Sequence, residues 1–159
     1  MTACSSEADN MAYFKTWEGI VEREWLDELD HVNFLTYQRI ADEASIAVWK
    51  DAKGEDDSSI GIEFVMTETY VRYIRELRLG DEVEIRTLLL AFDTKRFHLM
   101  HRIESQGELC CVVETANLCF NPIERRAANF TTRILDRFQN RVAIEGDNQP
   151  KLSIARRSG

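Results

Sequence analysis

One segment of the chain repeats its apolar residues with the period of a helix, and it lies among segments that alternate like strands. Asn33, just before this segment, is a preferred N-cap because its side-chain oxygen can accept a hydrogen bond from a free helical N–H. The pattern predicts one long helix over residues 34–52, whose apolar stripe must be buried against another element. The residues that carry this stripe are Tyr37, Ile40, Ala41, Ala44, Ala47 and Val48.

The other patterned segments favour strands joined by short turns. Consecutive strands with tight turns form an antiparallel sheet. The chain is therefore predicted to be α+β, with a five-stranded antiparallel sheet around the helix, and dimerisation is the usual way to cover the edge that such a sheet exposes. The expected strands span residues 14–24, 62–76, 83–92, 96–104 and 109–120, with a short helix over 132–138.

Length and charge limit what this chain can be. With 159 residues and no repeat or linker, we expect a single domain over 1–159, with its core at about 14–126, a polar N-terminal tail and a C-terminal extension. The net charge of −8 argues against binding to nucleic acid or to an anionic membrane. The start MTACSSEADN has no signal-peptide pattern, and no apolar run is long enough to span a membrane. We therefore expect a cytoplasmic protein.

The four cysteines do not have the spacing of a metal site or of a disulfide framework. They are Cys4, Cys110, Cys111 and Cys119, without a C-x-x-C pair or a nearby histidine. Adjacent strand residues point to opposite faces, so Cys110 and Cys111 cannot jointly bind one metal from a regular strand. We expect them to pack as small buried side chains.

The loop before the helix holds the densest group of chemically useful side chains. Asp27 and His31 are four residues apart and immediately precede the helix N-terminus. The first turn of a helix presents free N–H groups and a partial positive charge. A carboxylate beside such donors has what acyl transfer needs, which is a group that attacks or activates water and donors that stabilise an oxyanion. An acid at this position can equally serve only to stabilise the helix dipole.

Two further groups of residues admit both a structural and a functional interpretation. Glu68 and Tyr70 alternate onto the same predicted strand face as Phe64 and Met66, so the Glu68 carboxylate is expected to be either paired or functional. The cluster formed by Lys95, Arg96, His98 and His101 has the charge to bind phosphate, although alternating basic residues usually mark a solvated strand face.

The same loop resembles a motif of the hotdog-fold acyl-CoA thioesterases in the 4-hydroxybenzoyl-CoA thioesterase-like superfamily. Their motif D-x-x-G-H-V-N-N-x-x-Y is matched by Asp27, His31, Val32, Asn33 and Tyr37. The W-x-D-x-x-x-H pattern that begins at Trp25 is similar to the carnitine- and betainyl-CoA-linked subgroup, and Leu79–Val83 resembles the family's G-D turn. The likeness covers residues 14–126 and departs from the motif at Asp30, where relatives have glycine, and at Phe34, where they have a second asparagine.

The resemblance implies a hotdog fold and hydrolysis of a small or medium acyl-CoA to the free acid and CoA. No metal or organic cofactor is implied, since coenzyme A is part of the substrate. Asp27 matches the catalytic nucleophile or general base, His31 a residue that orients substrate or water, and Asn33 one that holds the lytic water or caps the helix. Backbone amides around residues 30–33 would be the oxyanion donors, and Glu68 matches a strand acid that faces the same pocket.

The resemblance also implies where substrate binds and how the chain assembles. It implies a homodimer with the active site across the interface, and pairing of dimers into a homotetramer is left open. The residues assigned to the acyl pocket are Phe34, Tyr37 and Tyr70. Those assigned to the phosphates of coenzyme A are Lys95 and Arg96, with Arg125 and Arg126 behind them.

Two alternative functions stay open on the sequence alone. A hotdog hydratase or dehydratase would use a carboxylate and a histidine as acid and base across a C=C bond, and Asp27 and His31 suit that chemistry too. A non-catalytic acyl-CoA-binding protein would result if Asp30 or Phe34 had closed the reaction site.

Overall fold

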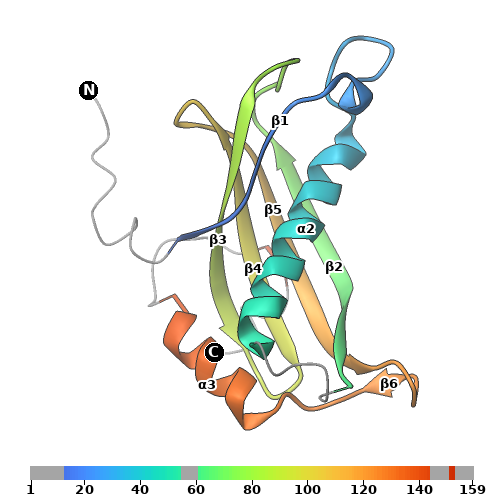
Figure 1. The fold of residues 1–159 in the computed structure, drawn as a ribbon, viewed down its shortest axis with the longest axis vertical. Coiled ribbons are helices and arrows are strands. Elements are labelled where there is room, and N and C mark those ends of the chain that lie inside the picture. The colour runs from blue at the N-terminus through green and yellow to red at the C-terminus, as the bar shows by residue number, and fades with distance from the viewer. Residues whose placement is uncertain (1–12, 55–60, 144–150, 153–159) are drawn as a thin grey trace.

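The computed structural model describes residues 13–54, 61–143 and 151–152, so Cys4 and the N-terminal tail lie outside the described residues. The strands are numbered β1–β6 and the two α-helices are α2 and α3 (Figure 1). In chain order the elements are β1 (Phe14–Ile20), the 3-10 helix η1 (Arg23–Trp25), α2 (Phe34–Lys53), β2 (Glu63–Tyr73), β3 (Glu82–Phe92), β4 (Arg96–Ser105), β5 (Glu108–Asn121), β6 (Arg126–Ala127) and α3 (Thr132–Arg141).

The sheet is antiparallel throughout, as the short turns predict. Its strand order is β1-β3-β4-β5-β2, with the two-residue β6 paired to the end of β5. Helix α2 lies along one face of this curved sheet, and α3 lies near the far end of α2 (Figure 1). The predicted α+β architecture, with a long helix against an antiparallel sheet, is confirmed.

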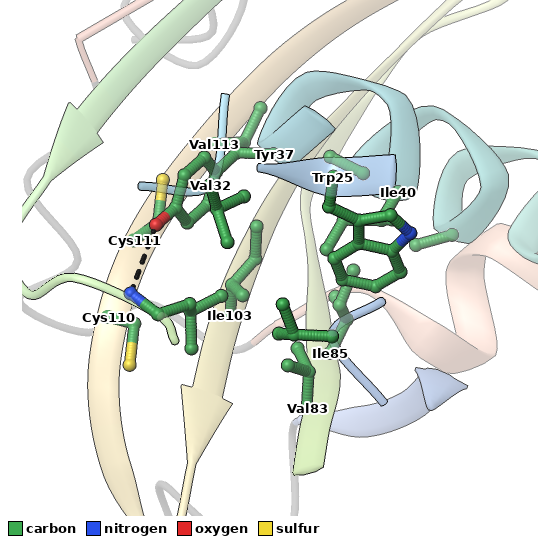
Figure 2. Close-up of a cluster of buried hydrophobic side chains, with 14 residues drawn as sticks. Trp25, Val32, Tyr37, Ile40, Val83, Ile85, Ile103, Cys110, Cys111 and Val113 are labelled. Carbon is green, nitrogen blue, oxygen red and sulfur yellow. Dashed lines mark hydrogen bonds between the residues drawn. The ribbon is translucent and has the colours of Figure 1, made fainter. Parts of the chain in front are cut away.

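Helix α2 begins and ends where its local sequence signals place the boundaries. The side chain of Asn33 accepts a hydrogen bond from Leu35 N at 2.9 Å, and the helix ends at Gly54, whose φ of 79° suits glycine. The predicted helical period is confirmed, because the stripe faces the sheet and divides into two apolar clusters. In the first, Trp25, Tyr37 and Ile40 pack toward residues of β3, β4 and β5 (Figure 2). The second is built around Trp49 and Phe97, whose rings stack at 5.9 Å.

A row of hydrogen-bonded polar side chains lies in the interior between α2 and the sheet. His101 of β4 is fully buried, with Nε2 2.8 Å from Ser45 Oγ and Nδ1 2.8 Å from Thr87 Oγ1. Burial lowers the pKa of His101 to about 3, so the ring is neutral near pH 7. The row of hydrogen bonds continues from Thr87 Oγ1 to Thr16 Oγ1 at 2.8 Å.

The second histidine of β4 lies on the opposite sheet face, as alternation predicts, and it is also buried. His98 Nε2 is 2.8 Å from Glu114 Oε1. Burial opposes ionisation of Glu114, but hydrogen bonds from His98 and from the backbone N–H groups of Lys151 and Leu152 lower its pKa overall. Neither His98 nor His101 is solvated, so the interpretation of this cluster as a phosphate site or a solvated face is wrong for both histidines.

Strand β2 departs from the predicted alternation. The register places Phe64 opposite Cys119, on the helix side of the sheet, but a β-bulge between Met66 and Glu68 reverses the faces. Glu68 and Tyr70 then lie opposite Ala116 and Glu114, on the face turned away from α2. The expectation that Glu68 and Tyr70 share the face of Phe64 and Met66 is therefore wrong.

Two expected strands are too long at their C-terminal ends. The first strand ends at Ile20, because the chain turns into η1 and buries Trp25. Strand β2 ends at Tyr73, because the N–H groups of Ile74 and Arg75 both donate to Cys110 O and the regular ladder stops there. The expected short helix is confirmed as α3, which buries Ile134 and Phe138 against the second apolar cluster.

The cysteines of β5 pack as small buried side chains, as expected. Cys110, Cys111 and Cys119 are free thiols, and burial raises the pKa of Cys111 to about 12. Among the residues that the structure describes, no group of His, Cys, Asp and Glu side chains could hold a metal ion. Neither does this part of the chain contain a helix long and apolar enough to cross a membrane.

Candidate active site

The loop before α2 is closed at its base by backbone pairing. Leu26 and Val32 form an isolated antiparallel bridge, and Asn33 N donates to Trp25 O at 2.8 Å. The Trp25 side chain anchors this base in the first apolar cluster, 5.9 Å from the Trp17 ring. The loop therefore holds its residues in a defined shape at the N-terminus of α2 (Figure 1).

Asp27 organises the tip of this loop. Its N–H donates to His31 O at 2.8 Å, and its side-chain Oδ1 accepts from the N–H groups of Leu29 at 2.9 Å and His31 at 3.2 Å. The second carboxylate oxygen, Oδ2, has no hydrogen-bond partner among the described residues. The side chain is thus held by one oxygen and presents the other from an exposed position.

Three of the four amides expected as oxyanion donors are already used inside the loop. Asp30 N donates to Asp27 O, His31 N to Asp27 Oδ1 and Asn33 N to Trp25 O. Within the described part of the chain, the N–H groups of Val32 and Phe34 have no acceptor. At the start of the helix, the Val32 and Phe34 amides are therefore the ones that could stabilise an oxyanion.

The backbone conformation at Asp30 is one that favours the glycine of the motif. Its φ is 59°, in the left-handed region that glycine adopts without strain. Aspartate tolerates this region better than most residues with a β-carbon. The departure from the motif therefore leaves the backbone shape of the loop intact.

This conformation gives a stability prediction for position 30. Replacing Asp30 with alanine is expected to lower the free energy of unfolding by about 1 kcal/mol relative to Asp30→Gly, because only glycine enters the left-handed region freely. Urea denaturation of the two variants measures the difference. Equal stability would show that the loop relaxes out of the left-handed conformation.

His31 contacts a residue that the sequence did not single out. Its Nδ1 is 2.9 Å from Oε1 of Glu76, in the segment that follows β2. The two residues are far apart in the sequence, and no local spacing relates them. Glu76 also lines a hollow of about 340 Å³ between residues 75–81 and 105–110.

Asn33, Phe34 and Tyr37 are brought close to this loop, in different roles. The Asn33 side chain caps the helix, and Phe34 is 58% exposed. The Tyr37 ring is buried, and its hydroxyl accepts a hydrogen bond from Leu77 N at 3.4 Å (Figure 2). Burial raises the pKa of Tyr37 to about 12. Tyr73 packs edge-on against Tyr37 at 5.3 Å and donates to Phe34 O at 3.1 Å.

The remaining expected site residues are not brought to this loop within one chain. Glu68 and Tyr70 are on the far face of the sheet. Arg96 begins β4 at the opposite end of the sheet and pairs with Asp93. Lys95 precedes it, and Lys95 O accepts from Cys119 N. Arg126 is in β6 at that same end, and Arg125 directly precedes it.

Similarity to known proteins agrees with this fold. A betainyl-CoA thioesterase of Pseudomonas aeruginosa is 27% identical over 130 residues, which cover 78% of this chain and 80% of that protein. The Protein THEM6 of Xenopus laevis is 39% identical over 88 residues, 55% of this chain, and the match spans only 42% of that relative. A hypothetical Staphylococcus aureus protein, solved in complex with CoA, superposes with a TM-score of 0.73 at 22% identity and covers 89% of this chain and 95% of that one.

The family itself is shown by a match over most of the folded chain. The model of the thioesterase-like superfamily matches residues 21–138, which include the whole loop and every strand except β1. The resemblance to hotdog thioesterases and the hotdog fold are both confirmed. The chain belongs to the thioesterase-like superfamily.

Proposed function

We propose that this protein is an acyl-CoA thioesterase that hydrolyses small or medium acyl-CoA esters to the free acid and CoA. The observation that carries the proposal is the bonding of Asp27, whose Oδ1 accepts from two backbone N–H groups while its Oδ2 has no hydrogen-bond partner among the described residues. Oδ2 acts on the thioester carbonyl, either directly as nucleophile or by taking a proton from the attacking water. On the nucleophilic route the acyl group passes to Oδ2 as the C–S bond breaks, CoA leaves as a thiolate that takes a proton from water, and a water molecule then hydrolyses the mixed anhydride to free acid and the Asp27 carboxylate. On the general-base route water adds to the carbonyl, its proton passes through Oδ2 to the sulfur, and the C–S bond breaks to give the acid and CoA thiol.

The relatives support this chemistry over the alternatives. The Pseudomonas aeruginosa relative is named for betainyl-CoA thioesterase activity and aligns with most of this chain. The Staphylococcus aureus neighbour supports only the fold at its level of identity, although that protein binds CoA. The Pseudomonas aeruginosa relative and the Asp27 Oδ2 atom, which no described residue bonds, favour hydrolysis of a CoA thioester. Coenzyme A is part of this proposed substrate, and we propose no added cofactor.

Strand β2 supports assembly of the enzyme as a homodimer. It is a sheet edge of 11 residues, and most of its residues are exposed. A long exposed edge with apolar side chains is suited to pairing with a second copy. The exposed apolar side chains on and just after β2 are Val65, Met66, Tyr70, Tyr73 and Ile74.

Pairing of β2 with its copy would complete the site. In an antiparallel pair related by a two-fold axis, the Glu63 end of one β2 lies beside the Tyr73 end of the other. Each Asp27 loop lies at the Tyr73 end, whereas Lys95, Arg96, Arg125 and Arg126 lie at the Glu63 end. The basic residues that are remote within one chain would thus approach the loop of the partner, where the CoA phosphates are expected.

Release of free thiol from a panel of acyl-CoA esters tests the proposed activity. The panel contains short-chain, medium-chain, aromatic and betaine-type esters. Turnover of at least one ester supports the thioesterase. Loss of the conjugated double bond of an enoyl-CoA without thiol release would instead indicate a hydratase. Calorimetric binding of CoA esters without any turnover would indicate a non-catalytic binding protein.

The proposed dimer gives a prediction that links assembly to activity. The variant Val65→Lys/Met66→Lys places four like charges along the paired edge, because each strand meets its copy. Light scattering is expected to show the native protein at about 37 kDa, twice the chain mass of 18.5 kDa, and the variant at the mass of one chain. Turnover should fall with the loss of dimer. A monomeric native protein with full activity would contradict the shared site.

The basic end of the sheet gives a second prediction about substrate binding. The variant Lys95→Ala/Arg125→Ala is expected to raise KM for acyl-CoA several-fold, because it removes charges assigned to the CoA phosphates. KM for the same acyl group on N-acetylcysteamine, which lacks those phosphates, should not change. Lys15→Ala, at the opposite sheet edge, is the matched control. An equal effect on both substrates would argue against phosphate binding at this end.

A further inference from the structure

His31 is attached to the protein at two separate places. Its backbone is tied to Asp27, because Asp27 N donates to His31 O and His31 N donates to Asp27 Oδ1. Its ring is tied through Nδ1 to Oε1 of Glu76, at 2.9 Å. One contact therefore sets where the residue lies, and the other sets how the ring is oriented.

The contact with Glu76 also selects the protonation form of the ring. An ionised carboxylate has only acceptors, so the hydrogen bond requires the proton on Nδ1. A neutral imidazole then carries its lone pair on Nε2. We propose that Glu76 is a positioning residue that holds His31 in the Nδ1–H tautomer and so directs a basic Nε2 toward the reacting water or thioester.

The backbone around Glu76 is anchored well enough for this role. Before it, the N–H groups of Ile74 and Arg75 both donate to Cys110 O, at 2.9 and 3.0 Å. After it, Leu77 is buried in the first apolar cluster and its N–H donates to the Tyr37 hydroxyl. Glu76 is thus an exposed side chain on a backbone that is held on both sides.

The charges around Glu76 leave it available to His31. Its second oxygen, Oε2, is 4.0 Å from Nε of Arg78, whose side chain is largely exposed. The neighbouring Arg75 is paired with Glu108 instead. Glu108 is therefore a matched control, since it is an acid on the same wall that pairs with an arginine and does not contact His31.

The first test reads the tautomer directly and needs no substrate. Long-range ¹H–¹⁵N spectra at about pH 8.5, well above the usual imidazole pKa of about 6.5, distinguish the two neutral forms. The His31 signals are identified by their loss in His31→Ala. The native ring is expected as Nδ1–H. Glu76→Ala removes the acceptor and is expected to shift the ring toward Nε2–H, whereas Glu76→Gln keeps an amide oxygen that can still accept from Nδ1–H. Glu108→Ala should change nothing. A native Nε2–H form, or a spectrum unchanged by Glu76→Ala, would overturn the proposal.

The second test reads the consequence for catalysis, and this part rests on the proposed thioesterase function. Glu76→Ala is expected to lower kcat about tenfold to a hundredfold, with KM changed less than about threefold, because the ring loses its orientation while the substrate is still bound. In a His31→Ala background the same change should have no further effect. An additive loss would show that Glu76 acts independently of His31. If no acyl-CoA is hydrolysed at all, the proposed function fails while the tautomer measurement still decides the role of Glu76.

Discussion

Replacing Asp27 with asparagine is expected to lower kcat for acyl-CoA hydrolysis at least about a hundredfold. Asparagine keeps an oxygen in the place of Oδ1, so the N–H groups of Leu29 and His31 retain their acceptor and the loop keeps its shape. The change falls on the free position, where Oδ2 becomes an NH₂ group that donates hydrogen bonds. Such a group can neither attack the carbonyl carbon nor accept a proton from water, so both proposed roles of Asp27 are lost together.

Two controls separate this chemical effect from damage to the loop. Glu28→Gln removes one charge from the same exposed loop and should keep kcat within about twofold. The free energy of unfolding of Asp27→Asn should stay within about 1 kcal/mol of the native value, because the loop hydrogen bonds persist. Native turnover in Asp27→Asn would remove Asp27 from the mechanism while leaving the thioesterase activity in place.

The parts of the fold that sequence reasoning predicted are those set by local signals. Helix α2 was predictable because its apolar period and its Asn33 cap both lie within the segment. The reversal of faces at Glu68 was not, because a β-bulge depends on the pairing of β2 with β5 and contains no glycine to mark it. The same limit applies to the end of β2, which is set by a carbonyl of the distant Cys110.

The candidate site divides in the same way. Asp27, His31 and Asn33 were found because they are neighbours in one loop, and a short motif records their spacing. Glu76 was missed because only the tertiary fold brings it to His31. The charge of Lys95 suggested a role in binding the CoA phosphates, but the sequence could not show its position relative to the loop, because that proposed role requires a second copy of the chain. The histidines of β4 are buried and so cannot belong to a phosphate site, but their burial could not be predicted from charge alone.

The buried histidine of β4 is expected to make the fold sensitive to mild acid. His101 is fully enclosed, and burial lowers its pKa to about 3. In the unfolded chain the same group binds a proton near its ordinary pKa of about 6.5. Between those values the unfolded state therefore binds more protons, so the stability conferred by the neutral ring is complete above about pH 6.5 and falls as pH decreases. Linkage gives a loss of about 2 kcal/mol between about pH 7 and about pH 5 from this residue.

Urea denaturation of the native protein and of His101→Gln across this pH range measures the contribution. Glutamine can still bond to Ser45 and Thr87 but does not titrate. Between about pH 7 and about pH 5, the free energy of unfolding of His101→Gln should therefore decrease by about 2 kcal/mol less than that of the native protein. The carboxylates are the same in both proteins, so their titration cancels in this difference. Equal pH dependence in both proteins would contradict the argument. If His101→Gln does not fold, NMR spectra of the native protein supply the test. The His101 ring should stay neutral between about pH 7 and about pH 5, because it is shielded from water and held between two hydroxyls. Titration of the ring in that range would contradict the argument.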